Sequence, residues 1–248
     1  MELGADFFLF VVVGLCAQLV DGALGMAYGL VSSTILLALG YPPASVSASV
    51  HTAEVFTTGV SGGSHALMGN VDKRLLWRLA VPGVIGGVAG AYFLTQVPGD
   101  AIKPFVYAYL LLLAVFVLLR GLGRFKPKGE VKRVGVLGLF AGFLDASGGG
   151  GWGPVATSTL LAHGGNARKT IGTVNTAEFA VSLAISIAFL LTIGLQHFEI
   201  VLGLLVGGVL AAPLAAYLVR RIPERGVLTA VGVLVMAIST YQIAHAVA

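Results

Sequence analysis

The chain consists of long apolar runs separated by short polar stretches, at about residues 7–39, 49–68, 75–94, 104–119, 134–162, 173–195, 198–219 and 227–247. Since about 20 helical residues cross a bilayer, six of these runs predict single membrane-spanning helices. The first and fifth are longer and contain glycine-rich sequence, at residues 21–25 and 145–151. Because each glycine weakens a helix by about 1 kcal/mol, these two runs predict broken helices.

An internal repeat appears when the chain is aligned with itself at a shift of 124 residues. Asp21 then falls on Asp145, and Thr-Ala-Glu ending at Glu54 falls on the same tripeptide ending at Glu178. Residues 21–55 show 12 identities in 35 positions, where composition alone would give roughly 3 or 4. We therefore predict two related halves, residues 1–119 and 134–248, joined by a basic linker at residues 120–133, all within one integral membrane domain.

Loop charges predict that the halves are inverted, because Lys and Arg in short loops mark the cytoplasmic side. The loop at residues 69–78 is basic, whereas its equivalent near residue 197 is not. Conversely, residues 168–169 and 220–225 are basic, whereas their equivalents have at most one basic residue. Inversion requires an odd number of crossings per half, so each broken segment is expected to enter and return as a hairpin, or to cross twice, before three spanning helices. Eight simple spans, with parallel halves, are the alternative.

Composition agrees with a membrane location and excludes several classes. Hydrophobic residues make up 57% of the 248 residues and charged residues 10%, against about 25% charged in soluble domains. We predict an all-α polytopic membrane protein with both termini outside, the linker in the cytoplasm and a retained first segment. The 15 basic residues behind the net charge of +4 lie in short clusters between the apolar runs, where they mark orientation and indicate no nucleic-acid partner. The single cysteine, Cys16, excludes a disulfide within the chain and is expected to be a packing residue.

Four acids lie inside the apolar runs: Asp21, Glu54, Asp145 and Glu178. A charge near mid-bilayer costs at least ~2.5 kcal/mol, so such residues usually face a cavity or pathway. Asp21 and Asp145 adjoin the glycine breaks, where capping of a helix end is an equally good explanation. Glu54 and Glu178 lie in regular helices, which favours a role in the pathway.

Two helices carry a polar face at helical spacing, one with Ser47, His51, Glu54 and Thr58, the other with Asn175, Glu178, Ser182 and Ser186. The two faces are predicted to look at each other across the pseudo-two-fold axis, although polar contacts between packed helices would also explain them. His51 could shuttle protons near neutral pH. Its repeat equivalent is Asn175, so it is no symmetric ligand.

The glycine breaks suggest an anion site, because broken helices in repeat-built transporters turn free backbone N–H groups toward anionic substrates. Each break would begin the second arm of a hairpin, and Tyr28 and Trp152 occupy equivalent positions that could line the site. The predicted substrate-binding residues are Asp21, Gly25, Tyr28, Gly29, His51, Asp145, Gly149, Gly150, Trp152, Gly153 and Asn175. Glu54 and Glu178 are the predicted proton-coupling residues.

No metal-ligand cluster, nucleotide-binding loop or nucleophile–base set is evident, so we expect no cofactor and no enzyme activity. A cation or metal transporter that uses the intramembrane acids is the alternative function. An intramembrane enzyme or a channel-like protein is a more distant one.

The duplicated Asp-x3-Gly-x3-Gly motif, followed in each half by Thr-Ala-Glu, resembles the sulfite exporter TauE/SafE family of bacterial membrane proteins. The resemblance covers essentially the whole chain and assigns the glycine-rich signatures to residues 21–29 and 145–154. It implies a secondary transporter of small sulfur-containing or organic anions, such as sulfite or sulfoacetate, in the bacterial inner membrane. Substrate and direction differ within the family. The expected partners are a small anion and the lipid bilayer, and the glycine-rich helix faces would also suit a homodimer.

Overall fold

The computed structural model describes residues 5–24, 26–124, 131–163, 166–194, 197–218 and 224–247, and these residues form helices and no strands. The helices of the first half are α1 (Ala5–Leu24), α2 (Tyr28–Ala38), α3 (Pro43–Leu67), α4 (Lys73–Gln96) and α5 (Gly99–Gly121). Those of the second half are α6 (Val134–Gly148), a π-helical turn η1 (Gly153–Thr157), α7 (Ser158–Ala162), α8 (Ala167–Thr192), α9 (Phe198–Leu218) and α10 (Glu224–Val247). The all-helical prediction is confirmed.

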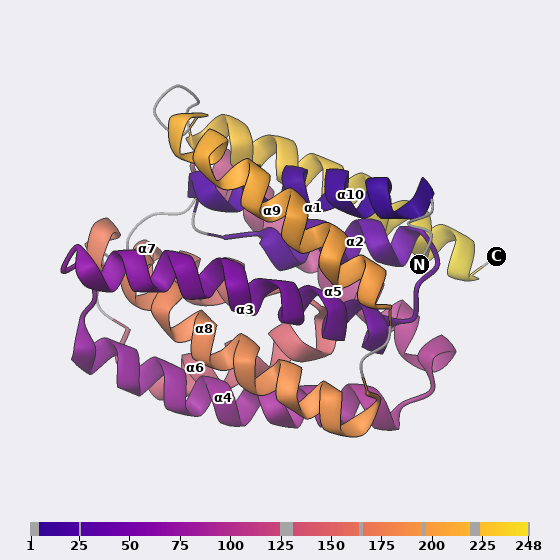
Figure 1. Ribbon diagram of the computed structural model, residues 1–248, viewed down its shortest axis with the longest axis horizontal. Helices are drawn as coiled ribbons and strands as arrows, with labels where there is room; N and C mark the ends of the chain where they lie inside the picture. Colours follow the sequence, from indigo (N-terminus) through magenta and orange to yellow (C-terminus); the bar gives the residue numbers. More distant parts are fainter. Residues whose placement is uncertain are drawn as a thin grey trace.

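Each half packs mainly against the other half. Helix α3 lies along α8, α5 lies along α10, α4 packs on α6, and α9 packs on α1 (Figure 1). The α3–α8 pair is antiparallel, because Gly62 meets Thr176 whereas Thr52, nearer the start of α3, shares a crevice with Ser186. Helices α5 and α10 also run antiparallel. Repeat-equivalent helices thus run in opposite directions, as inverted halves require; their orientation in a bilayer stays a prediction.

The broken segments are hairpins that return to the end where they started. Phe10, near the start of α1, makes an edge-to-face ring contact with Tyr41, which follows α2, with ring centroids 5.8 Å apart. In the second half, Val134 at the start of α6 and His163 after α7 line the same cavity. The two hairpins therefore enter from opposite ends of the molecule.

The basic loops gather at one end of the molecule. Lys169 at the start of α8 donates a 2.7 Å hydrogen bond to the carbonyl of Gly69, which follows α3. At the opposite end, Tyr41 contacts His197, with ring centroids 5.3 Å apart. Both chain termini also lie at that end (Figure 1). The basic segments at the starts of α4 and α8 thus lie together at one end, and the assignment of the two ends to an inside and an outside stays a prediction.

Glycines make the close helix contacts possible. A Cβ on Gly142 of α6 would overlap the carbonyl oxygen of Gly83 in α4, and a Cβ on Gly207 of α9 would overlap that of Val11 in α1. These overlaps show that backbone lies directly on backbone at both interfaces. Close approach of this kind drives helix association in lipid, where the hydrophobic effect between helices is absent.

The outer surface is apolar, with large exposed side chains such as Phe8, Val60 and Leu191. Four helices within the described residues are long and apolar enough to cross a membrane, at Lys73–Gln96, Gly99–Gly121, Arg168–Thr192 and Arg225–His245. Cys16 is exposed on α1, so its expected role as a packing residue is wrong.

Candidate functional site at the helix breaks

The two glycine breaks meet inside the molecule. A Cβ on Gly29, in the first turn of α2, would lie 2.8 Å from the Cα of Gly150 and 3.0 Å from the carbonyl oxygen of Gly149. Ser33 of α2 donates a hydrogen bond to that same Gly149 carbonyl. Because the hairpins enter from opposite ends, their contact lies between the two ends of the bundle.

The breaks need residues that tolerate an unusual backbone. Gly149 has a φ of 74°, in the left-handed region, and ends α6. Ala27, just before α2, has a φ of 91°. Non-glycine residues rarely adopt this conformation, which costs roughly 1–2 kcal/mol. Gly25 lies outside the described residues.

Buried acids accept hydrogen bonds from the backbone N–H groups that begin the second arm of each hairpin. Asp145 Oδ1 accepts from Trp152 N at 2.9 Å, and Asp21 accepts from Tyr28 N, the equivalent bond in the other half. Glu54 accepts from the next N–H of α2, at Gly29. Helix N-termini carry free N–H groups and a partial positive charge, so carboxylates are stabilised there. The capping interpretation of Asp21 and Asp145 describes this geometry well.

His51 links two of the acids. Its Nε2 lies 3.1 Å from Asp145 Oδ2 and 4.0 Å from Glu54 Oε2, and the His51 and Glu54 side chains are almost fully buried. His51 Nδ1 lies 2.7 Å from the carbonyl oxygen of Ser47. A carbonyl only accepts, so Nδ1 must carry a hydrogen. The contact between Nε2 and Asp145 then holds one shared proton, on either the imidazole or the carboxyl.

The predicted pairing of the two polar faces is only partly correct. Asn175 of α8 does reach α3, where its amide donates to Ser61 Oγ at 3.0 Å. Ser47, however, turns toward the second break and donates to the carbonyl of Ala146 at 2.6 Å, and His51 points the same way. A face of α3 therefore serves the break of the other half, because α6 packs beside α3 at this depth.

Glu178 lies near the same group of charges. It is 9% exposed and interacts electrostatically with Glu54, Asp21 and Asp145. One oxygen of Glu54, Oε2, is buried without a hydrogen-bond partner. Glu54, Asp145 and Glu178 are buried and Asp21 is partly buried, and electrostatic interactions connect Glu178 to the other three acids.

Tyr28 and Trp152 are buried beside the breaks, and their polar groups are engaged with backbone. The Tyr28 hydroxyl donates to the carbonyl of Leu204 at 3.2 Å, and the Trp152 indole N–H donates to that of Val174 at 3.2 Å. Gly153 packs against Met26, where a Cβ would lie 2.7 Å from that side chain. These bonds fix the second arms to α9 and α8.

Two contacts at the breaks have no strong signal in the sequence. The Tyr109 hydroxyl of α5 donates to the carbonyl of Gly150 at 3.1 Å, although Tyr109 lies in an otherwise apolar run. Ser33 belongs to a short Ser-Ser-Thr run within α2, which is a weak sign that this helix has polar neighbours.

A helical membrane protein with buried acids at two broken, facing hairpins has the architecture of a membrane transporter. The family model of the sulfite exporter TauE/SafE matches residues 10–241, and the chain belongs to this family. It is 49% identical over 223 residues to the probable membrane transporter protein YtnM of Bacillus subtilis (strain 168), a match covering 86% of this chain and 74% of that protein. No solved structure matches significantly. The protein is therefore a multi-pass membrane transporter and not an enzyme.

Proposed function

We propose that the protein is a proton-coupled secondary transporter of small sulfur-containing oxyanions or organosulfonates, with sulfite and sulfoacetate as the substrate class. The observation that carries the proposal is the occupancy of the break N–H groups by carboxylates. An oxyanion needs the same donors that now hold Asp21, Glu54 and Asp145. Family membership supports the substrate class.

The carboxylates and the substrate anion compete for the same backbone N–H donors, and this competition couples anion transport to proton transport. Protonation removes the negative charge of a carboxylate and weakens it as an acceptor, since charge-assisted hydrogen bonds are roughly twice as strong as neutral ones. The Tyr28 and Gly29 N–H groups then become available to an anion. Loss of the proton restores the carboxylate, which displaces the anion by repulsion and by competition for the donors. Each anion therefore moves with protons in the same direction.

His51 supplies a route for the proton. It shares one proton with Asp145 and lies 4.0 Å from the unpartnered oxygen of Glu54. A proton can pass from Asp145 through Nε2 of His51 to Glu54 after a small rotation of the glutamate. Glu178 lies next in the same buried region and extends the path across the interface of the halves.

Alternating access follows from the opposite entry of the hairpins. If the first hairpin moves against the second, the meeting point of the breaks opens toward one end and closes toward the other. The inverted halves, the cytoplasmic position of the basic loops and a location in the bacterial inner membrane are parts of this proposal.

The test is sulfite uptake into proteoliposomes under an imposed proton gradient. Wild-type uptake is expected to rise when the side from which sulfite enters is made acidic, and Glu54→Gln and Glu178→Gln are expected to abolish that dependence. Glu199→Gln is the matched control, because Glu199 is half exposed and contacts His197 far from the breaks. Unchanged pH dependence in Glu54→Gln and Glu178→Gln would refute the coupling role. Uptake of a divalent cation in place of sulfite would favour a cation transporter.

A further inference from the structure

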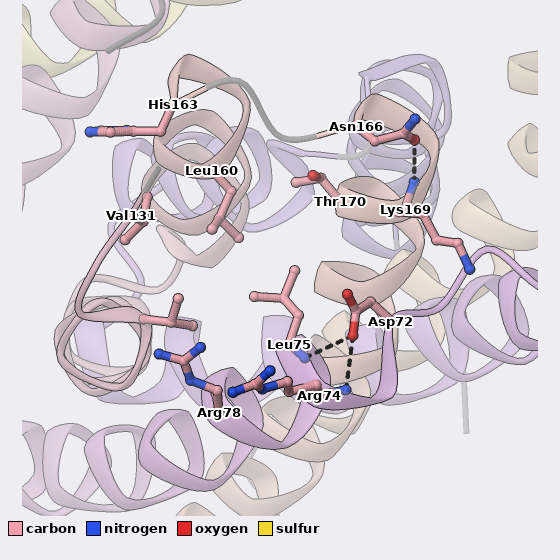
Figure 2. Close-up of a pocket in the computed structure, with 11 residues that line it drawn as sticks. Asp72, Arg74, Leu75, Arg78, Val131, Leu160, His163, Asn166, Lys169 and Thr170 are labelled. Atoms are coloured by element: carbon pink, nitrogen blue, oxygen red, sulfur yellow. Dashed lines mark hydrogen bonds between the residues drawn. The ribbon is translucent and has the colours of Figure 1, made fainter. Parts of the chain in front are cut away.

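A cavity of 640 Å³ opens at the basic end of the molecule (Figure 2). It lies between the start of α4, the start of α6, the end of α7 and the start of α8. Its polar lining, which we call the basic vestibule, consists of Asp72, Arg74, Arg78, His163, Asn166, Lys169 and Thr170. The vestibule is separate from the helix breaks described above.

Two polar members of the vestibule are already engaged. Asp72 caps α4, its Oδ1 accepting from Arg74 N at 2.9 Å and Leu75 N at 3.1 Å. The Lys169 ammonium points away from the cavity (Figure 2) and donates to the carbonyls of Gly69 and Val71. One oxygen of Asp72 is therefore engaged in the cap of α4, and the Lys169 ammonium is engaged with the backbone that follows α3.

The arginines are the uncommitted charges. Arg74 and Arg78 are four residues apart on α4, which places both on one face of the helix, and both guanidinium groups lie along the same wall of the cavity (Figure 2). Within the described part of the chain, no Asp or Glu lies within ion-pair distance of either. Like charges at this spacing repel each other, so an anion between them would relieve the repulsion.

The side chains that line the cavity suit a small oxyanion. Each guanidinium presents a planar fork of N–H donors that matches the oxygens of sulfur and phosphorus oxyanions. Leu75 and Leu160 project into the cavity from opposite walls (Figure 2). Apolar walls of this kind raise the local attraction between a cationic cleft and an anion.

The vestibule also ends close to the second helix break. Its buried floor includes Thr170 of α8. One helical turn further along α8, the carbonyl of Val174 accepts the indole N–H of Trp152. An anion held at Arg74 and Arg78 would thus lie at the end of the molecule from which the second hairpin, which carries Trp152, enters.

We propose that Arg74 and Arg78 form a capture site for small soluble oxyanions, which concentrates the anionic substrate at the basic end before it reaches the helix breaks. The proposal rests on the proposed anion transport. It adds a second binding site for the same substrate class, on the side that the loop charges assign to the cytoplasm.

The test compares the double variant Arg74→Gln/Arg78→Gln with Lys73→Gln. Lys73 is exposed on the same turn of α4, carries one positive charge as each arginine does, and does not line the cavity. Sulfite flux is measured in phosphatidylcholine vesicles with sulfite on the side of the basic end. The double variant is expected to raise KM about tenfold at low ionic strength with Vmax unchanged. The difference should largely disappear at high salt, because the Debye length falls to about 3 Å at 1 M.

Equal KM values in the double variant and Lys73→Gln would overturn the capture site while leaving anion transport intact. If the wild type transports no sulfite or sulfonate, the proposed function fails, and sulfite binding in neutral detergent then decides about the vestibule. Loss of that binding only in the double variant supports the site, and equal binding overturns it. An effect seen only in vesicles with phosphatidylglycerol, without a difference in sulfite binding, would assign the arginines to lipid phosphate and also overturn the proposal.

Discussion

At the scale of residues, the break region combines buried charge with tight backbone contacts. Asp145 contacts both His51 and the backbone of Trp152, so its two oxygens have different partners. The equivalence of Asp21 and Asp145 was predictable from the repeat, and so was a capping role. The partnership of His51 with Asp145 was not, because the two residues lie 94 positions apart and in different halves. Only the packing of α6 beside α3 brings them together.

The contact between His51 and Asp145 should be strongly coupled energetically. We expect a double-mutant cycle with His51→Gln and Asp145→Asn to give a coupling of about 1–3 kcal/mol, since each single change leaves a buried partner unpaired. Unfolding in mixed detergent micelles measures it. The control cycle uses His197 and Glu199, an exposed pair at 3.6 Å, for which less than about 1 kcal/mol is expected. Equal coupling in the two cycles would contradict a strong buried contact between His51 and Asp145.

The backbone contact between the two helix breaks is expected to leave no room for an added methyl group. A Cβ on Gly150 would overlap the backbone of Gly29 and Leu30, so Gly150→Ala is expected to destabilise the protein by about 2 kcal/mol or more and to abolish transport. Gly63→Ala is the control, because nothing lies within 4 Å of its Cβ position. It should be neutral or gain up to about 1 kcal/mol of helix propensity. Wild-type stability and flux in Gly150→Ala would show that the breaks do not meet as described.

At the scale of elements, long helices were predictable and their partners were not. Apolar runs located the helices because a bilayer imposes length and hydropathy on every span. The return of each hairpin followed from the loop charges, because inverted halves require an odd number of membrane crossings per half. The spacing of the glycines indicated close helix packing but not which helix is the neighbour, because many helices could pack against a stripe of small residues. The structure selects α4 with α6 and α1 with α9, so each hairpin packs on a helix of the other half.

These interfaces predict a pattern of sensitive glycines. Gly142→Ala and Gly207→Ala place a methyl group on a backbone carbonyl of the facing helix. Each is expected to cost about 1–3 kcal/mol in unfolding free energy as the helices separate. Gly135→Ala on the same α6 is the control, because its Cβ would meet its neighbours at 3.5 Å, an ordinary contact distance. Similar stability losses in all three variants would contradict the idea that the overlap with the facing backbone decides the cost, because helix propensity alone favours Ala over Gly.

At the scale of the whole molecule, loop charge and tertiary structure describe the same two ends. The contact of Lys169 with Gly69 gathers basic loops at one end, and the contact of Tyr41 with His197 gathers poorly charged loops at the other. With parallel halves, the loops after α3 and before α8 would lie on opposite sides of the bilayer. The structure places them together.

Cysteine labelling in cells should reveal the sidedness. In a Cys16→Ser background, Met68→Cys and Asn166→Cys are expected to react with a membrane-impermeant maleimide only from the inside. Gln96→Cys and Phe198→Cys should react only from the outside, because they lie near the opposite end of the bundle. Labelling of Met68→Cys and Asn166→Cys from different sides would refute the inverted arrangement.

The sequence by itself determined the membrane location, the helices, the repeat and the set of intramembrane acids. A bilayer penalises every charge and every short helix so strongly that these features can be recognised in the local sequence. Tertiary structure decided which acid meets which donor, since hydrogen bonds between Asp145, His51 and the breaks depend on packing across the two halves. It also decided that Arg74 and Arg78 face a cavity in which the lining carboxylate, Asp72, caps α4 and makes no ion pair with either arginine. Charge along a chain marks a side of the membrane, and only the folded arrangement of helices can make it a binding site.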